Sequence, residues 1–130
     1  KYDIFSTHYI NNKDRLFARR LFTKLYTPLL NLIFVMNLPY YNGVSLYKNK
    51  IFKKIKINTN SHAWQVELWV KSKKIKNLKY KFIPTILNDR KKGASAFRFF
   101  NSIKVLITII RLFPISVKLN FFKYLKKKIN

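Results

Sequence analysis

The chain has 130 residues, enough for one domain with a modest core, and carries 28 Lys and Arg against four Asp and Glu, a net charge of +24. Hydrophobic residues make up 48% of the sequence and aromatic residues 17%, which excludes the composition of a disordered chain. There is no cysteine and there are only two histidines and four scattered carboxylates. We therefore expect no disulfide, no metal, no cofactor, no small-molecule substrate and no enzyme activity.

The first third of the chain predicts a strand, a helix and a second strand. Weak alternation over residues 2–10 indicates the strand. Apolar residues spaced three and four apart over residues 13–26 predict an amphipathic helix that ends or kinks at Pro28. The apolar run 32–36 is rich in strand formers and predicts a strand, with continuation of the helix as the alternative.

Two lysine-rich segments in the middle of the chain predict a long antiparallel hairpin. Residues 50–58 read K-I-F-K-K-I-K-I-N, and residues 64–70 alternate between apolar and other side chains. Six lysines follow in residues 71–81. The predicted hairpin spans residues 46–81, with its charge concentrated on two arms, residues 48–56 and 71–81.

The last third predicts a loop, a helix and a final strand. Residues 89–96 are typical of a loop, and a helix follows that ends at Pro114. Strict alternation over residues 115–121 predicts a strand, and residues 122–130 form a basic tail. The predicted helix has an apolar stripe at helical spacing, which we expect to pack in the core: Ile103, Leu106, Ile107 and Ile110.

The predicted order is strand, helix, strand, strand, helix, strand. This is the order of a ferredoxin-like split β-α-β fold of the α+β class. It predicts a four-stranded antiparallel sheet with two helices on one face and the basic hairpin projecting from it, all within a single domain, residues 1–130.

Three windows of the sequence, together with this order, resemble the small-subunit ribosomal protein S-ten family. They are Asn37-Leu38-Pro39, residues 61–67 and residues 102–121. Compared with the family pattern, residues 83–100 are an insertion before the second helix. The resemblance implies a structural protein in the head of the small ribosomal subunit, whose hairpin lies between ribosomal RNA and neighbouring ribosomal proteins. The excess of amino acids with A/T-rich codons, taken with the resemblance, implies a mitochondrial ribosome.

The sequence also predicts which residues bind RNA. Because so few acids can pair with the lysines, we expect those on the hairpin arms to contact phosphates, the alternative being solvated strand faces or protection of a sheet edge. His62 and Trp69 are expected to stack on unpaired bases, and Trp64 lies on the opposite face of the predicted strand from Trp69, so at most one of the two belongs to the core. The candidate RNA-binding residues are Lys48, Lys50, Lys53, Lys54, Lys56, His62, Trp69, Lys71, Lys73, Lys74, Lys76, Arg90, Lys91 and Lys92.

Two other functions fit the composition. In the first, the chain is a peripheral basic subunit of a mitochondrial inner-membrane complex: the apolar runs 28–36 and 103–117 pack on membrane helices, and lysines meet anionic lipid. In the second, it is another nucleic-acid-binding protein of an organelle. No segment reaches the ~20 apolar residues of a membrane-spanning helix, so the sequence favours RNA over a membrane as the partner.

Overall fold

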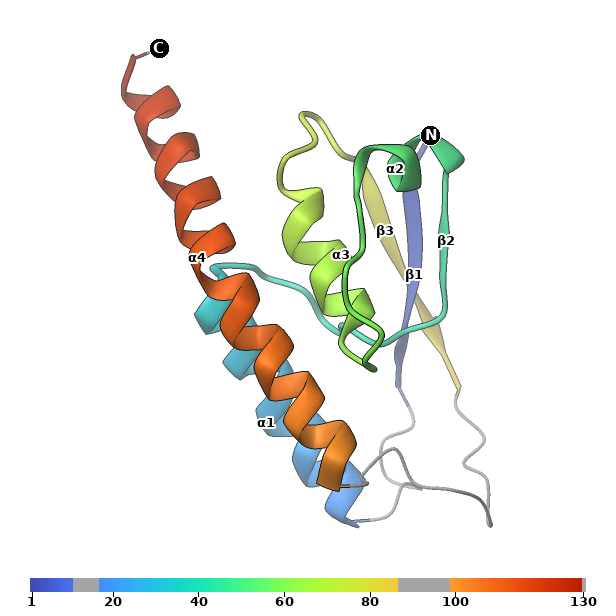
Figure 1. Ribbon diagram of the computed structural model, residues 1–130. Coiled ribbons are helices and arrows are strands. Elements are labelled where there is room, and N and C mark those ends of the chain that lie inside the picture. Colours follow the sequence, from blue (N-terminus) through green and yellow to red (C-terminus); the bar gives the residue numbers. More distant parts are fainter. Residues whose placement is uncertain (11–16, 87–98, 130) are drawn as a thin grey trace.

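The computed structural model describes residues 1–10, 17–86 and 99–129. These residues form three strands and four helices (Figure 1). In chain order they are β1 (Ile4–Tyr9), α1 (Phe17–Phe34), β2 (Ser45–Tyr47), α2 (Asn49–Lys54), α3 (Trp64–Ser72), β3 (Tyr80–Thr85) and α4 (Phe99–Ile129).

Strand β1 is the centre of a mixed sheet with the strand order β2-β1-β3. It pairs antiparallel with β2 and parallel with β3. Alternate side chains of β1 point to opposite faces: Ile4 and Ser6 are buried on an inner face, and Phe5 lies on an outer face. Phe5 lies opposite Leu46 of β2 and Lys81 of β3, so these residues share the outer face.

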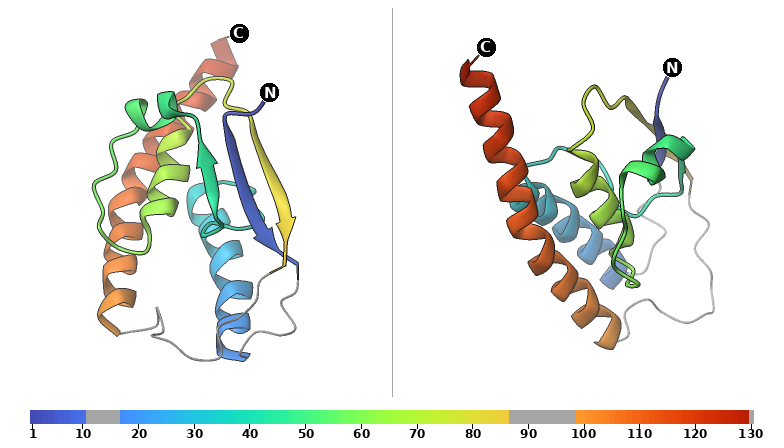
Figure 2. Two further views of the ribbon diagram at one scale, coloured as in Figure 1. Left: turned by 90° about the vertical axis from the view of Figure 1, so that its right-hand side faces the viewer. Right: turned by 45° about the horizontal axis from the view of Figure 1, so that its top comes forward.

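Helix α3 lies between the sheet and α4, and α1 runs beside α4 (Figures 1 and 2). Every residue of α3 after Trp64 is buried. The ring of Trp69 stacks on Phe82 of β3, with 5.5 Å between centroids, and meets Tyr80 edge-on at 5.6 Å. One core cluster joins α3 to buried side chains of the other layers, among them Ile4, Leu30, Phe34 and Leu112.

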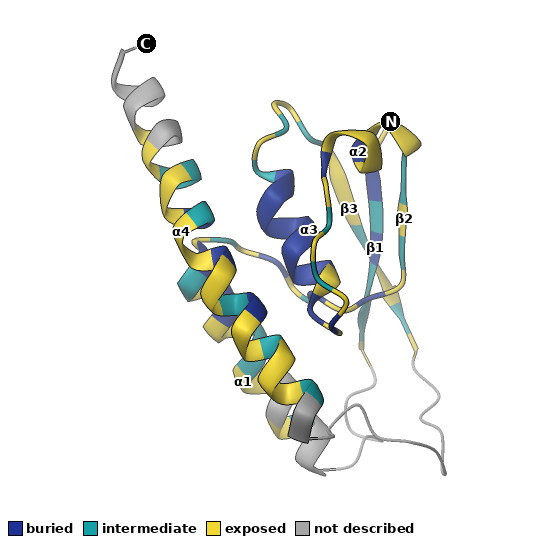
Figure 3. Ribbon diagram, viewed as in Figure 1, coloured by how far each residue is buried: buried dark blue, intermediate teal, exposed yellow. Residues whose placement is uncertain are grey.

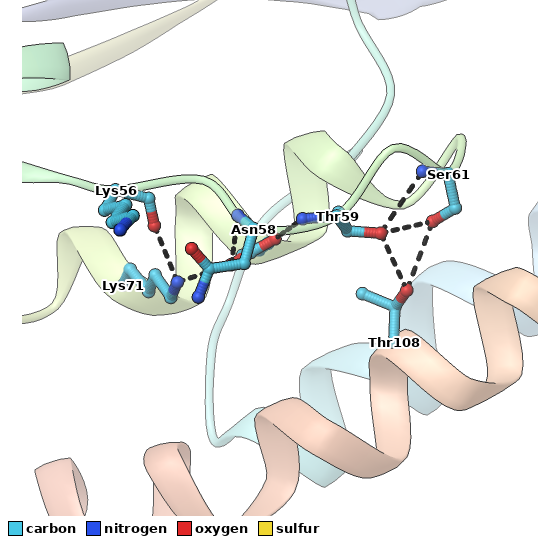
Figure 4. Close-up of polar contacts among 7 residues, drawn as sticks. Lys56, Asn58, Thr59, Ser61, Lys71 and Thr108 are labelled. Carbon is cyan, nitrogen blue, oxygen red and sulfur yellow. Dashed lines mark hydrogen bonds and ion pairs between the residues drawn. The ribbon is translucent and has the colours of Figure 1, made fainter.

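The buried carboxylate of Glu67 binds the loop that precedes α3 (Figure 4). It accepts hydrogen bonds from the backbone N–H groups of Asn58 at 3.0 Å and Thr59 at 2.9 Å. Lys71, one turn later in α3, donates to the same carboxylate and to the carbonyl oxygen of Lys56, the latter at 2.6 Å. These bonds compensate the cost of removing the two charges from water, as a stable buried ion pair requires.

Hydroxyl groups connect this loop to α4 (Figure 4). Oγ1 of Thr59 lies 3.0 Å from Oγ1 of Thr108, and Oγ of Ser61 lies 3.1 Å from the same atom. Two turns further along α4, the hydroxyl of Ser116 donates to the carbonyl oxygen of Phe34 at the end of α1, at 3.2 Å. Polar side chains of α4 therefore point toward the rest of the molecule.

The prediction of a four-stranded antiparallel, ferredoxin-like sheet with two helices is wrong, because the sheet has three strands in a mixed arrangement and the described chain has four helices. The basic hairpin, residues 46–81, is wrong as well: α2 lies within its first arm, residues 48–56, and α3 forms where the second strand was expected. The second arm, residues 71–81, consists of the end of α3, a loop and the start of β3. Alternation was misleading in α3 because this helix is buried on every side, so its apolar residues need not follow the helical period. Its polar residues are satisfied internally, as where Gln65 donates to the carbonyl oxygen of Gly43 at 2.6 Å.

Two apolar runs predicted as strands are helical. The run 32–36 contains the end of α1, in agreement with the alternative prediction that the preceding helix continues. Residues 115–121 lie inside α4. Pro28 and Pro114 lie within these helices rather than ending them. Both prolines lie at exposed positions. Each leaves the carbonyl group four residues earlier without its helical hydrogen bond, and at an exposed position this disturbs no core contact.

Other predicted elements are confirmed or displaced. The strand expected over residues 2–10 is confirmed as β1, and the helix expected over residues 13–26 is confirmed from Phe17 onward. Strand β3 occupies the start of the predicted insertion, of which residues 87–98 lie outside the described residues. The predicted basic tail, residues 122–130, continues α4 as far as Ile129.

Replacing Glu67 by Gln should lower the free energy of unfolding by about 3 kcal/mol, because it leaves the buried Lys71 ammonium without its counter-charge. Urea unfolding at neutral pH measures this loss. The matched control is Lys74→Gln, which also removes one charge but at an exposed position, and it should unfold like the parent chain. Equal stability of the two variants would show that Glu67 does not hold the loop.

Candidate functional site

Helix α4 exposes a continuous apolar stripe. Its members recur every three or four residues, so they lie on one side of the helix over about six turns. All are more than one-third exposed, and Ile110 reaches 63%. We call this stripe the outer apolar face of α4; it consists of Ile103, Leu106, Ile107, Ile110, Phe113, Val117, Phe121 and Tyr124.

The inward side of α4 combines polar and apolar side chains: Val105, Ile109 and Ile115 pack against the core. Its fully enclosed residues include Thr108 and Ser116, which hydrogen bond to other elements, alongside Leu112. Asn120 accepts a hydrogen bond from Lys73 at 2.8 Å on the same side. A helix on the surface of a water-soluble protein usually has a polar side opposite the side that faces the core, whereas α4 carries a second apolar stripe there. The outer apolar face therefore points to an apolar environment outside the described chain.

Three cations lie along one flank of the outer apolar face. Lys104, Arg111 and Lys118 are spaced seven residues apart, so they fall on nearly the same side of α4, two turns from one another. All three side chains are exposed. The surface of α4 thus combines an apolar stripe with an adjoining cationic row.

Helix α1 continues this surface. Leu21, Leu25, Leu29 and Leu32 are exposed at spacings of four, four and three residues, and Leu32 is 76% exposed. The opposite side of α1 carries the buried Leu30. Helix α1 runs beside α4, and both helices contribute to the same core, so each exposes an apolar stripe away from that core (Figures 1 and 3).

The structure corrects the expectation for the Ile103 stripe. Ile103, Leu106, Ile107 and Ile110 were expected in the core, and all four are exposed. Their spacing correctly predicts a helix, but α4 is apolar on two sides. The signal in the sequence that distinguishes these sides is the pair of hydroxyl residues, Thr108 and Ser116, on the side opposite the stripe.

The predicted RNA-binding lysines do not form one cationic arm. Lys48 and Lys50 bind Asp3, at 2.9 and 3.2 Å, and Lys71 is buried against Glu67. Lys73 donates to Asn120 and to the carbonyl oxygen of Phe34. The predicted lysines that are exposed lie on α2 and on the loops before and after α3, and they include Lys50 although it binds Asp3: Lys50, Lys53, Lys54, Lys56, Lys74 and Lys76.

The positions of the two tryptophans bear on the prediction that Trp69 stacks on RNA. Trp69 is 1% exposed and packs against β3, whereas Trp64 is 38% exposed. His62 is exposed, so its predicted role stays open to test. Three further predicted contacts lie outside the described residues: Arg90, Lys91 and Lys92.

Two general features bear on the chemistry of this surface. Among the described residues, no helix has the length and apolar character needed to cross a membrane. The described residues also contain no group of three or more His, Cys, Asp or Glu side chains that could hold a metal ion.

Asp3 joins the start of the chain to α2. Hydrogen bonds from the Lys48 ammonium, the backbone N–H of Lys79 and the Lys50 ammonium hold the pKa of Asp3 well below its usual range. A carboxylate with a depressed pKa stabilises the fold above its unfolded pKa, and this contribution is lost as the pH falls through the folded pKa.

Asp3→Asn should therefore make stability less sensitive to acid. The parent chain should lose stability as the pH falls below about 4, since Asp3 has an unfolded pKa of about 3.9. Urea midpoints measured from about pH 6 to pH 2 test this: the variant should start lower, decline less steeply and approach the parent at the acid end. Parallel curves for the two chains would mean that Asp3 contributes nothing to the acid dependence.

Comparison with known proteins yields no relative from which a function could be transferred: no family model matches the chain, and no curated protein and no solved structure is significantly similar to it.

Proposed function

We propose that this chain is a peripheral membrane-binding protein that lies on an anionic lipid surface through the exposed sides of α1 and α4. One observation carries the proposal: α4 exposes eight large apolar side chains along one side, although its opposite side already packs on the core. An amphipathic helix of this kind lies in the plane of the interface, with its apolar side at the boundary between headgroups and acyl chains.

The cations beside the outer apolar face supply the electrostatic part of this interaction. Lys104, Arg111 and Lys118 lie next to the stripe, where they can meet lipid phosphates while the apolar side chains enter the interface. Each basic residue near an anionic surface contributes about 1 kcal/mol, so this row contributes about 3 kcal/mol. The net charge of +24 adds long-range attraction to the same surface.

Lipid explains the exposed surface of α1 and α4 better than RNA does. Proteins hold RNA through phosphate contacts and through stacking on aromatic rings or Arg, and aliphatic side chains supply neither. The stripes on α1 and α4 consist mainly of Leu, Ile and Val. Assignment to a mitochondrial ribosome stays a prediction. The hairpin through which the chain was expected to bind RNA is not formed.

The proposal retains part of the hypothesis that the chain is a subunit of an inner-membrane complex. That hypothesis placed the apolar runs 28–36 and 103–117 against membrane helices, with lysines on anionic lipid. Both runs contribute exposed residues to the helical surface, including Leu32 and Ile110. The partner now proposed is the lipid interface itself rather than a membrane-embedded subunit.

The double variant Leu106→Gln/Ile110→Gln should bind anionic vesicles at least tenfold more weakly than the parent. It removes two exposed apolar side chains without changing the charge, and burial of one such side chain is worth roughly 1.5–3 kcal/mol when complete. Co-sedimentation with phosphatidylcholine vesicles containing phosphatidylserine measures the affinity. Val44→Gln, an exposed apolar position outside α1 and α4, should bind like the parent.

A second arm of this experiment separates lipid from RNA. Binding to vesicles of phosphatidylcholine alone should be much weaker, because the electrostatic part is then lost. Equal vesicle binding by the parent and the double variant would refute the proposal. Tight binding of both chains to ribosomal RNA, lost steeply as salt is raised, would instead support the ribosomal prediction.

A further inference from the structure

The outer face of the sheet is a second uncovered apolar surface. Strand register places Phe5, Leu46 and Lys81 side by side on it, and Thr7 lies opposite Ile83 in the next such row. Val44 precedes β2 by one residue, two positions before Leu46, and its carbonyl oxygen accepts the backbone N–H of Thr7 at 3.0 Å. We call these six residues the outer sheet face.

The two flanking strands of this face are exposed, whereas Phe5 and Thr7 on the central strand are half-buried. Leu46 is 72% exposed, Val44 70% and Ile83 42%. Among the described elements, α3 packs on the inner face, and α1 and α4 lie beyond it (Figures 1 and 2). Sheets with parallel strands normally have both faces covered, and β1 and β3 form a parallel pair.

The charge of the outer sheet face indicates what covers it. Basic residues number 28 in 130, but only Lys81 among the six residues of this face is charged. The ammonium of Lys81 lies 5.8 Å from the centre of the Tyr2 ring, so it is folded back over the neighbouring aromatic side chain. This face can therefore meet an identical face without bringing rows of lysines together.

We propose that two copies of the chain associate through their outer sheet faces. The two sheets would pack face to face about 10 Å apart, the usual separation of stacked sheets. Such a dimer leaves the exposed sides of α1 and α4 free, since those helices lie beyond the inner face of each sheet (Figure 1). The inference does not depend on the lipid proposal.

Salt provides a distinctive test of this dimer. Each copy carries +24, so the two copies repel over long range, whereas the contact itself is apolar. Raising salt shortens the range of repulsion from about 10 Å at 0.1 M to about 3 Å at 1 M. Dimerisation should therefore strengthen with salt, while binding to an anionic surface weakens.

Sedimentation equilibrium of the lipid-free chain at low and high salt measures this. We expect dimer at high salt, and a dissociation constant at least tenfold larger for Leu46→Lys, which places a charge at the centre of the contact. Leu32→Lys adds the same charge on α1 and is the matched control: it should dimerise like the parent but bind vesicles more weakly. Leu46→Lys should bind vesicles normally. Both positions are more than 70% exposed, so both variants should fold.

Each other outcome overturns the dimer. A monomer at every salt concentration means that a different polypeptide covers the outer sheet face. If Leu32→Lys is monomeric while Leu46→Lys still forms the dimer, the copies meet through α1 and α4 instead.

Discussion

The carboxylate of Glu67 determines how α4 is oriented on the rest of the molecule. It binds two backbone N–H groups of the loop before α3 and is neutralised by Lys71. That loop then presents Thr59 and Ser61 to Thr108 of α4. The hydroxyl side of α4 is turned inward by these bonds, so its apolar stripe is turned outward. The proposed membrane surface is thus a consequence of a polar contact on the other side of the same helix.

Charge and apolar surface play separate roles in this chain. Asp3 and Glu67, the acidic residues within the described part of the chain, are both engaged by lysines, so neither offsets the positive surface. A field of this sign attracts lipid headgroups and nucleic acid alike. The distribution of apolar side chains is what distinguishes these partners. It places one uncovered surface on α1 and α4, beside cations, and another on the sheet, where cations are sparse.

Alternation and periodicity predicted some elements and failed at others for identifiable reasons. Residues 2–10 alternate because β1 has an inner and an outer face, and the prediction of a strand there is confirmed. Residues 64–70 alternate by coincidence: α3 is enclosed on all sides, so nothing in its packing required a helical period. Residues 115–121 lie on α4, which is apolar on two sides, so their alternation did not indicate a strand. Pro114 is exposed, and the helix continues through it. The predicted RNA-binding residues stay a prediction, but the hairpin that was to carry them is not formed.

The sequence by itself determined the excess of positive charge, the absence of cysteine chemistry, the first strand and the helical spacing of the Ile103 stripe. These are properties of composition and of neighbouring residues along the chain. Only the folded arrangement shows which side of α4 is buried, that Trp69 belongs to the core, and that Lys48 pairs with Asp3 and Lys71 with Glu67. Those outcomes depend on partners far away in the sequence: Thr108 meets residues 59 and 61, and Trp69 meets Phe82. A local pattern shows that a helix has an apolar side, but long-range contacts decide whether that side faces the core.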